Sequence, residues 1–297
     1  MIRKLRILTL VENNAGSGLR AEHGLSVWIE ADNRRILFDT GQGDALMPNA
    51  SALGVPLQSA DAIVLSHGHY DHTGALAAAL KAAAGASLYL HPAAVENKYG
   101  MNPQPPHRYI GMPDEARRAV RSRLQDVVWT SLPTRVAPDV FVTGPIPRHT
   151  DFESVDGFCL DEQCSTPDDM LDDQALYMFT ADGIIVVLGC GHSGVVNTLD
   201  YVAALTGTDR FAAVIGGMHL GGASEARLAA TADTLARYDV QLIAPCHCTG
   251  AAAVGYLSSR FPDRCVECNA GTRFESDEAE ASGPGQEAGT AADQQAP

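Results

Sequence analysis

The sequence predicts a mixed α/β protein, because strands and helices alternate along most of its 297 residues. Short apolar runs rich in β-branched residues are typical of buried strands, and alanine- and leucine-rich runs with a helical period separate them. Between residues 36 and 90 this alternation is the signature of an α/β fold. The second half repeats the pattern, so we expect two lobes that face each other across a shared cleft.

The first half begins with three antiparallel strands, predicted at 5–11, 25–30 and 35–38 and joined by a loop at 13–18 and a turn. A helix at 44–53 leads to a strand at 62–65, and a helix at 75–84 leads to a strand at 87–90. The segment 92–136 departs from this order, because prolines at 103, 105 and 106 exclude a helix or a central strand there. We interpret it as an insertion, with a helix from 113 or 114 to 125, that caps a site and presents Arg108 and Tyr109 to an anionic substrate.

In the second half, 141–145 and the acidic stretch 151–173 carry few apolar residues and are predicted as loops. A hairpin at 175–180 and 184–188 comes next. Helices are then predicted at 197–205, 224–238 and 251–259, with Ser224 as an N-cap, and strands at 211–215, 240–244 and 265–274. Residues 275–297 are of low complexity, and we expect a disordered acidic tail there.

One stretch, Ser66-His67-Gly68-His69-Tyr70-Asp71-His72, lies where a predicted strand turns into a helix. Imidazole nitrogens and a carboxylate oxygen are the ligands that suit zinc, iron or manganese. His67 and His69 are two residues apart, so in an extended segment both point to one side. Asp71 and His72 follow where the chain bends, and the spacing therefore predicts two adjacent metal positions.

Three successive strands of the second half each end just before a histidine, namely His192, His219 and His247. Ligand sites in α/β sheets lie at the carboxyl ends of the strands. We therefore expect these histidines to converge on the histidine cluster of the first half.

The pattern His67-x-His69-x-Asp71-His72, preceded by Leu37-Phe38-Asp39-Thr40-Gly41, resembles the metallo-β-lactamase superfamily. The resemblance implies a four-layer αββα sandwich with metals at one edge between two sheets. It covers residues 1–274 as one catalytic domain with a cap-like insertion at about 92–136. Segments at 22–26, 189–194, 216–220 and 245–250 are similar to the branch named after a 7,8-dihydropterin-6-ylmethyl-4-(β-D-ribofuranosyl)aminobenzene-5′-phosphate synthase of methanopterin biosynthesis.

The resemblance also implies a set of site residues. One or two zinc ions are expected, with iron or manganese as alternatives, and the hypothesised ligands are His67, His69, Asp71, His72, His192 and His247. Asp39 is expected to hydrogen-bond a ligand histidine or to cap the next helix. Asp71 would also orient the attacking water, and His23 and His219 would contact the substrate or transfer a proton to the leaving group. Cys190 stands where related proteins place a metal-bridging aspartate, and it is either a ligand or a small buried residue. His149 is a further candidate ligand.

The resulting prediction is a metal-dependent hydrolase that uses a metal-activated water or a polarised phosphate group. Its substrate would be a phosphorylated or pterin/phosphoribosyl-type small molecule. One alternative is a synthase-type transferase of the methanopterin pathway. Another is a metal-dependent oxidoreductase like the diiron flavoproteins, which carry Glu where His69 stands and need a flavodoxin domain. A metal-stabilised binding module is a third. Cys246-x-Cys248 and Cys265-x-x-Cys268 resemble a structural zinc site with imperfect spacing.

Composition excludes several partners. The net charge is −15, and residues 275–297 contribute six acids and no Lys or Arg, which leaves −9 for the rest. Such a surface repels phosphate backbones, so nucleic acid is not an expected partner. No apolar run reaches the roughly 18 residues of a membrane span. The N-terminal stretch is too short for a signal peptide, so we expect a cytoplasmic protein with seven reduced cysteines.

Overall fold

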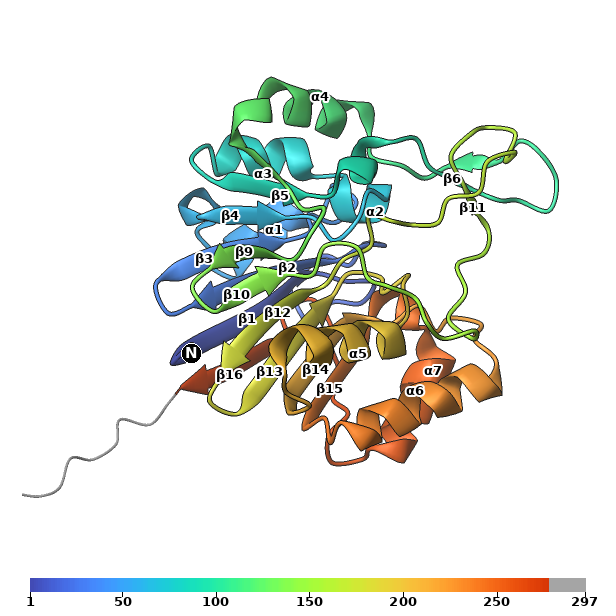
Figure 1. Cartoon of the computed structure of the whole chain (residues 1–297). Coiled ribbons are helices and arrows are strands. Elements are labelled where there is room, and N and C mark those ends of the chain that lie inside the picture. The colour runs from blue at the N-terminus through green and yellow to red at the C-terminus, as the bar shows by residue number, and fades with distance from the viewer. Residues whose placement is uncertain (278–297) are drawn as a thin grey trace, which may run out of the picture.

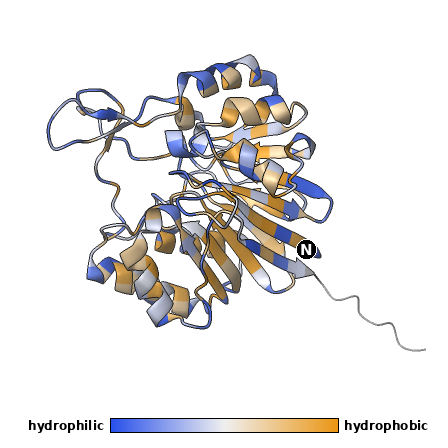
Figure 2. Cartoon of the chain, turned by 180° about the vertical axis from the view of Figure 1, so that it is seen from behind, coloured by the Kyte–Doolittle hydropathy of each residue, from blue (hydrophilic) through white to orange (hydrophobic). Residues whose placement is uncertain are grey.

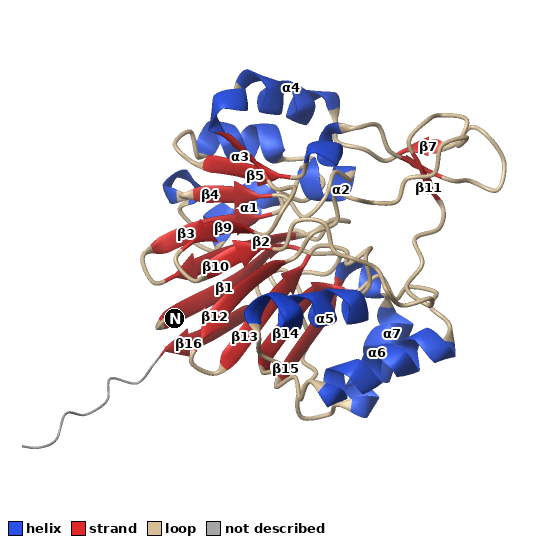
Figure 3. Cartoon of the chain, in the orientation of Figure 1, coloured by secondary structure: helices blue, strands red, loops and turns tan. Residues whose placement is uncertain are grey.

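Two β-sheets face each other, and helices cover the outer surface of each sheet, as Figures 1 and 3 show. The structure, a computed structural model, describes residues 1–277. The predicted four-layer αββα arrangement is confirmed. None of the helices in this described part is long and apolar enough to cross a membrane.

The first sheet has seven strands in the order β16-β1-β2-β3-β4-β5-β8. Neighbours from β16 to β3 are antiparallel, and those from β3 to β8 are parallel. The strands are β1 (Lys4–Val11), β2 (Ser26–Ala31), β3 (Arg34–Phe38), β4 (Ala62–Val64), β5 (Ser87–Leu90), β8 (Val127–Trp129) and β16 (Arg273–Asp277).

The second sheet has six strands in the order β15-β14-β13-β12-β10-β9, and β13, β14 and β15 are parallel. The strands are β9 (Thr134–Ala137), β10 (Val140–Val142), β12 (Leu176–Thr180), β13 (Gly183–Leu188), β14 (Phe211–Gly217) and β15 (Leu242–Cys246). A small third sheet of β6 (Tyr99–Gly100), β7 (Arg108–Tyr109) and β11 (Phe158–Cys159) projects to one side of the main sheets (Figures 1 and 3).

Three layers of apolar side chains hold the sandwich together. One fills the space between the sheets, and two lie between a sheet and its helices. In β1, Ile7 faces the other sheet and Leu8 faces the helices, because successive side chains of a strand point to opposite faces. Where both faces are buried, the strands are largely apolar, and these stretches are orange in Figure 2. The helices are α1 (Leu46–Ala52), α2 (Tyr70–Thr73), α3 (Leu76–Ala82), α4 (Asp114–Ser122), α5 (Val195–Thr206), α6 (Glu225–Arg237) and α7 (Ala251–Arg260).

The structure corrects three of the predicted boundaries. The end of the insertion supplies β8 and β9, which belong to the main sheets. The predicted loop at 141–145 contains the end of β10, where Val140 and Val142 are buried between the sheets. Such strands of three or four residues show too little alternation to be recognised from sequence.

The last strand, predicted at 265–274, begins only at Arg273, after Gly271 turns the chain with a φ of 99°. It runs to Asp277, so the first three residues of the predicted tail lie in a strand. The rest of that tail, 278–297, is outside the described residues.

Candidate metal centre

The site lies at the edge of the sandwich where β4, β13, β14 and β15 end. His67 and His69 follow β4, and His72 lies on the short helix α2. His192, His219 and His247 come just after β13, β14 and β15, respectively. The described residues contain three sets of donor atoms that lie within 4.8 Å of one another. All six predicted ligands fall into two of these sets, which we call group one and group two.

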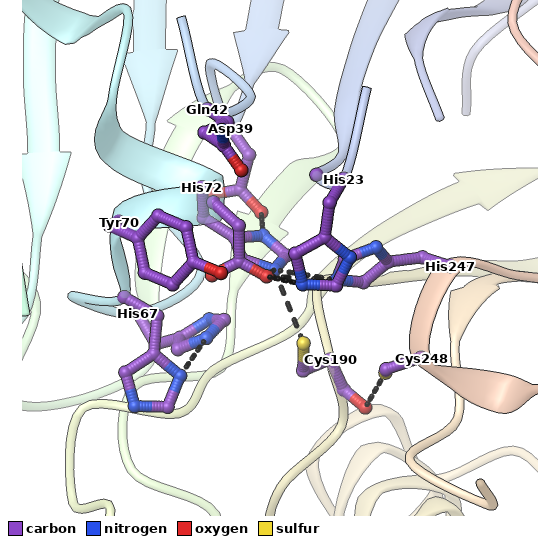
Figure 4. Close-up of polar contacts among 12 residues, drawn as sticks. His23, Asp39, Gln42, His67, Tyr70, His72, Cys190, His247 and Cys248 are labelled. Atoms are coloured by element: carbon purple, nitrogen blue, oxygen red, sulfur yellow. Dashed lines mark hydrogen bonds and ion pairs between the residues drawn. The ribbon is translucent and has the colours of Figure 1, made fainter. Parts of the chain in front are cut away.

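Group one consists of Asp71, His72, Cys190 and His247 (Figure 4). His72 Nε2 is 3.2 Å from both Cys190 Sγ and His247 Nε2. Asp71 Oδ2 is 3.3 Å from His247 Nε2 and 3.8 Å from His72 Nε2. Ligands at 2.0–2.1 Å from a tetrahedral zinc ion are about 3.3–3.4 Å apart. The spacing of these donor atoms therefore fits one tetrahedral ion.

Group two consists of His67, His69 and His192, all buried. His67 Nε2 faces His69 Nδ1 at 3.0 Å, and the ring centroid of His192 is 4.8 Å and 4.9 Å from those of His67 and His69. His69 Nε2 and both ring nitrogens of His192 have no hydrogen-bond partner within residues 1–277. Buried nitrogens without a partner are costly, and a cation bound to one nitrogen of each ring would reduce that cost.

Burial keeps the group-two imidazoles neutral, which is the form that binds metal. It lowers the pKa of His69 to about 3, and it holds the pKa of His67 and of His192 well below the usual range. Three neutral imidazoles that crowd together offer nitrogen lone pairs that suit a divalent metal. The type and the spacing of the donor atoms in both groups therefore suit a metal ion.

Asp39 orients one histidine in each group. It is buried and has a positive φ of 57°. His72 Nδ1–H donates to its Oδ2 at 2.7 Å, as expected from the sequence, which leaves Nε2 free for a metal. Ser66 Oγ donates its proton to the same oxygen at 2.6 Å. The hydroxyl oxygen can then accept the Nδ1–H of His67, 2.8 Å away, which leaves the Nε2 of His67 free of a proton. In the metal-free protein burial opposes protonation of His72, but Asp39 and Asp71 raise its pKa to about 9, so a metal that binds at Nε2 displaces a proton from it.

His247 is fixed by residues that follow β1. Its backbone N–H donates to Glu12 Oε1 at 2.7 Å, and its Nδ1 is 3.1 Å from Asn13 Oδ1, which leaves Nε2 for group one. His247 and His219 have positive φ values of 53° and 47°. Such backbone strain concentrates at functional sites.

The loop of His67 and His69 is anchored by a buried ion pair that the sequence did not predict. Lys98 Nζ is 2.8 Å from carboxylate oxygens of both Asp168 and Asp172, and Asp172 Oδ2 accepts the backbone N–H of Gly68 at 2.7 Å. A Cβ on Gly68 would lie 2.2 Å from the carbonyl oxygen of Ala94. The loop can therefore take this path only with glycine between the two histidines.

His23 and Tyr70 lie beside group one (Figure 4), and His23 is its exposed neighbour, with a side chain that is 54% exposed. His23 Nε2 is 3.2 Å from Asp71 Oδ2, and this hydrogen bond raises the pKa of His23. Arg108 donates to the hydroxyl of Tyr70 at 2.9 Å and lies over its ring, and its contact with an anionic substrate stays a prediction. Tyr109 instead donates to the carbonyl of Met112, away from group one.

Cys190 also belongs to the third set, with His192 and His219, and it thus lies beside both metal groups. Burial raises the pKa of its thiol well above the usual value, so a bound cation is needed to favour the thiolate. The His219 ring centroid is 4.4 Å from that of His192, and its Nδ1 is buried without a partner in the described chain.

Phe158 is a site residue that sequence reasoning missed, because it lies in the acidic stretch predicted as a loop. Its ring centroid is 5.2 Å from that of His69 and 5.1 Å from that of His192. It lies in β11, which pairs with β6 of the insertion, so the predicted cap needs both segments. No local pattern marks it.

Other sequence candidates lie elsewhere. His149 is on the surface, 3.0 Å from Asp200. Cys265, which was part of the candidate structural zinc site, hydrogen-bonds Ser258, and it belongs to none of the metal sets found in residues 1–277. The expectation that all seven cysteines are reduced is wrong for Cys159 and Cys164, which form a disulfide because the turn after β11 brings them together.

Comparisons with known proteins agree with this geometry. Residues 19–151 match the metallo-beta-lactamase superfamily. An uncharacterized protein of Methanocaldococcus jannaschii is 33% identical over 253 residues, which cover 85% of this chain and 93% of that protein. The 7,8-dihydropterin-6-methyl-4-(beta-D-ribofuranosyl)-aminobenzene-5′-phosphate synthase of the same organism is 28% identical over 287 residues, or 91% of this chain and 96% of the relative.

Solved structures are also similar. Tm1679, described as a metal-dependent hydrolase of the beta-lactamase superfamily, has a TM-score of 0.76 at 27% identity and covers 92% of this chain and 99% of its own. Zn²⁺-bound PqqB from Methylobacterium extorquens shares the fold alone, with a TM-score of 0.54 at 12% identity over 91% of this chain and 99% of its own.

Proposed function

The chain belongs to the metallo-β-lactamase superfamily, and we propose that it is a metal-dependent hydrolase of a phosphorylated small molecule. A single catalytic domain over residues 1–274 would carry the activity. The observation that carries this proposal is the meeting of two donor sets from distant parts of the chain, with buried imidazole nitrogens that have no other partner within residues 1–277. The description of Tm1679 as a metal-dependent hydrolase supports the reaction class.

We assign the ligands to two adjacent zinc positions. Group two (His67, His69 and His192) would hold one ion, and group one (Asp71, His72, Cys190 and His247) would hold the other. Iron and manganese suit the imidazole and carboxylate donors as well, whereas a cysteine favours zinc. Zinc supplies a Lewis acid that polarises the group under attack and lowers the pKa of a bound water toward 7.

The protein's own groups provide orientation and proton transfer. Asp71 would accept a hydrogen bond from the attacking water, while its own position is fixed by the hydrogen bond to His23. An imidazole N–H of His219 would donate a proton to the leaving group. Phe158 and the small third sheet would exclude solvent from the side of His69 and His192.

Metal analysis together with a substrate panel tests this proposal. We expect purified protein to contain zinc and to hydrolyse at least one phosphate ester or phosphodiester. His69→Ala should lose zinc and activity, whereas His149→Ala, which removes a surface histidine, should keep both. A His69→Ala protein with full zinc content and full activity would contradict the assignment.

A second candidate is a synthase-type transferase, favoured by the relative whose name is a ribofuranosylaminobenzene-5′-phosphate synthase. Both activities use an anionic substrate at the same metals, but a transferase passes the phosphoribosyl group to an acceptor other than water. Turnover of a phosphoribosyl donor that requires an aromatic amine, combined with no hydrolysis across the ester panel, would replace the hydrolase proposal with this one.

A further inference from the structure

A recess of about 180 Å³ opens directly beside the metal ligands. His192 and His219 form one wall, Phe158 lies in another, and the third is the start of α6 with Arg227. Pockets that enclose a whole small molecule measure about 300–1,000 Å³. This recess therefore fits one chemical group of a substrate, placed next to the metal centre.

Arg227 is the cation that lines the recess. It lies in the first turn of α6, and its side chain is half-buried. Nε is buried without a hydrogen-bond partner in the described chain. Burial raises the pKa of Glu153 and the nearby charge of Arg227 opposes this rise, so the two groups interact. The Glu153 carboxylate, however, accepts the backbone N–H groups at the start of α5 rather than a hydrogen bond from the guanidinium. Asp156 also lines the recess, but it is exposed and accepts a hydrogen bond from Ser154, so solvent screens it. A half-buried guanidinium with an unpaired Nε–H can still donate a charge-assisted hydrogen bond to an anionic ligand.

The backbone of the same wall favours an anion as well. Gly222 lines the recess with a φ of 80°, and its N–H donates to no group among residues 1–277. Two residues later Ser224 caps the 13-residue helix α6, so the positive end of the helix dipole lies at the recess. Arg227, Gly222 and the residues just before α6 thus border the same small volume.

We propose that this recess binds the phosphoryl group of the substrate and that Arg227 is the residue that selects it. This inference rests on the proposed function, because it assigns a place to the phosphate of that substrate. A phosphoryl group has three terminal oxygens, so it can accept from the Arg227 fork and from the Gly222 N–H and still turn an oxygen toward His192 and His219. A planar carboxylate has only two oxygens and satisfies fewer of these donors.

Binding of inorganic phosphate to the zinc-loaded protein tests the recess without any turnover. In Arg227→Gln we expect the dissociation constant for phosphate to rise about 10- to 100-fold, because hydrogen bonds to a charged group are lost. Arg227→Lys should recover only part of this loss, since lysine keeps the charge but not the fork. Arg118→Gln, at an exposed arginine of α4, should bind phosphate as the wild type does. Zinc content should be the same in all four proteins.

An equal dissociation constant for phosphate in the wild type and in Arg227→Gln would overturn the proposal, since the metals alone would then hold the anion. The proposal would also fail if Arg227→Gln weakened acetate binding more than phosphate binding, because the recess would then be a carboxylate site. A protein that binds phosphate through Arg227 but hydrolyses nothing would refute the proposed hydrolase and leave the recess in place. Conversely, if the wild type is a hydrolase and Arg227→Gln binds phosphate as tightly as it does, the recess is not the phosphate site, and the proposed function stands.

Discussion

Replacing Asp39 by asparagine tests whether one buried carboxylate sets the state of both metal groups. The change keeps Oδ1, which accepts the Ser66 N–H at 2.7 Å, and turns Oδ2, the acceptor for His72 and Ser66 Oγ, into a donor. Ser66 Oγ can rotate to accept from the new amide, but the His72 ring can keep a hydrogen bond only with its proton on Nε2, the ligand atom. We therefore expect about 1.5–3 kcal/mol less stability without metal and about 10- to 100-fold weaker zinc binding.

Zinc titration against a competing chelator and urea unfolding of the metal-free protein measure the two effects separately. Asp182→Asn is the matched control, because Asp182 lies exposed in the turn between β12 and β13. It should change neither quantity by more than the roughly 0.5 kcal/mol typical of surface substitutions. If Asp39→Asn bound zinc as tightly as the wild type, the argument that Asp39 fixes the tautomer of His72 would be refuted.

Three further predictions concern the surroundings of the site. Lys98→Met leaves two buried carboxylates unpaired and should cost about 3–5 kcal/mol by urea unfolding, against little change for the exposed Lys81→Met. Burial opposes the charge of Lys98, but its carboxylate partners raise its pKa above 10.5. The difference in stability should therefore persist from neutral pH to pH 10.5 and shrink as the pH rises through the raised pKa. Loss of the difference near neutral pH would contradict this. Gly68→Ala should weaken zinc binding, because its Cβ would lie 2.2 Å from the carbonyl oxygen of Ala94. Gly85→Ala has open space around it and should bind zinc as the wild type does. Equal zinc affinities in the two variants would argue against a close contact between Gly68 and Ala94. With zinc present at about 100 times its Kd, addition of a chelator should lower the free energy of unfolding of the wild type by about 2.7 kcal/mol and that of His69→Ala hardly at all. A wild type whose free energy of unfolding does not change with chelator would contradict the metal assignment.

Local patterns predicted most of the fold because most of its elements are long enough to show a period. The helix predicted at 224–238 is observed at Glu225–Arg237, with Ser224 Oγ accepting the N–H of Arg227 as the predicted cap. β8, β9 and β10 were missed because each has only three or four residues, and their place is decided by pairing with strands far along the chain.

The residues of the site likewise divide into those that sequence patterns predicted and those that they missed. The cluster His67 to His72 was predictable because its ligands are close in sequence and need no partner to reveal their chemistry. Phe158 and Arg227 were missed because an isolated aromatic residue and a helical arginine have many ordinary roles. Only the recess that they share distinguishes them.

The sequence by itself determined the α/β class, the kind of donor atoms and the strand ends at which they would gather. These follow from residue type and short-range spacing, which act without knowledge of the rest of the chain. Tertiary structure alone decided that His72 and His247, 175 positions apart, bring their Nε2 atoms within 3.2 Å, and that Cys190 lies beside both groups. It also decided which nitrogens remain without partners, because burial and hydrogen bonding depend on every segment that packs around the site.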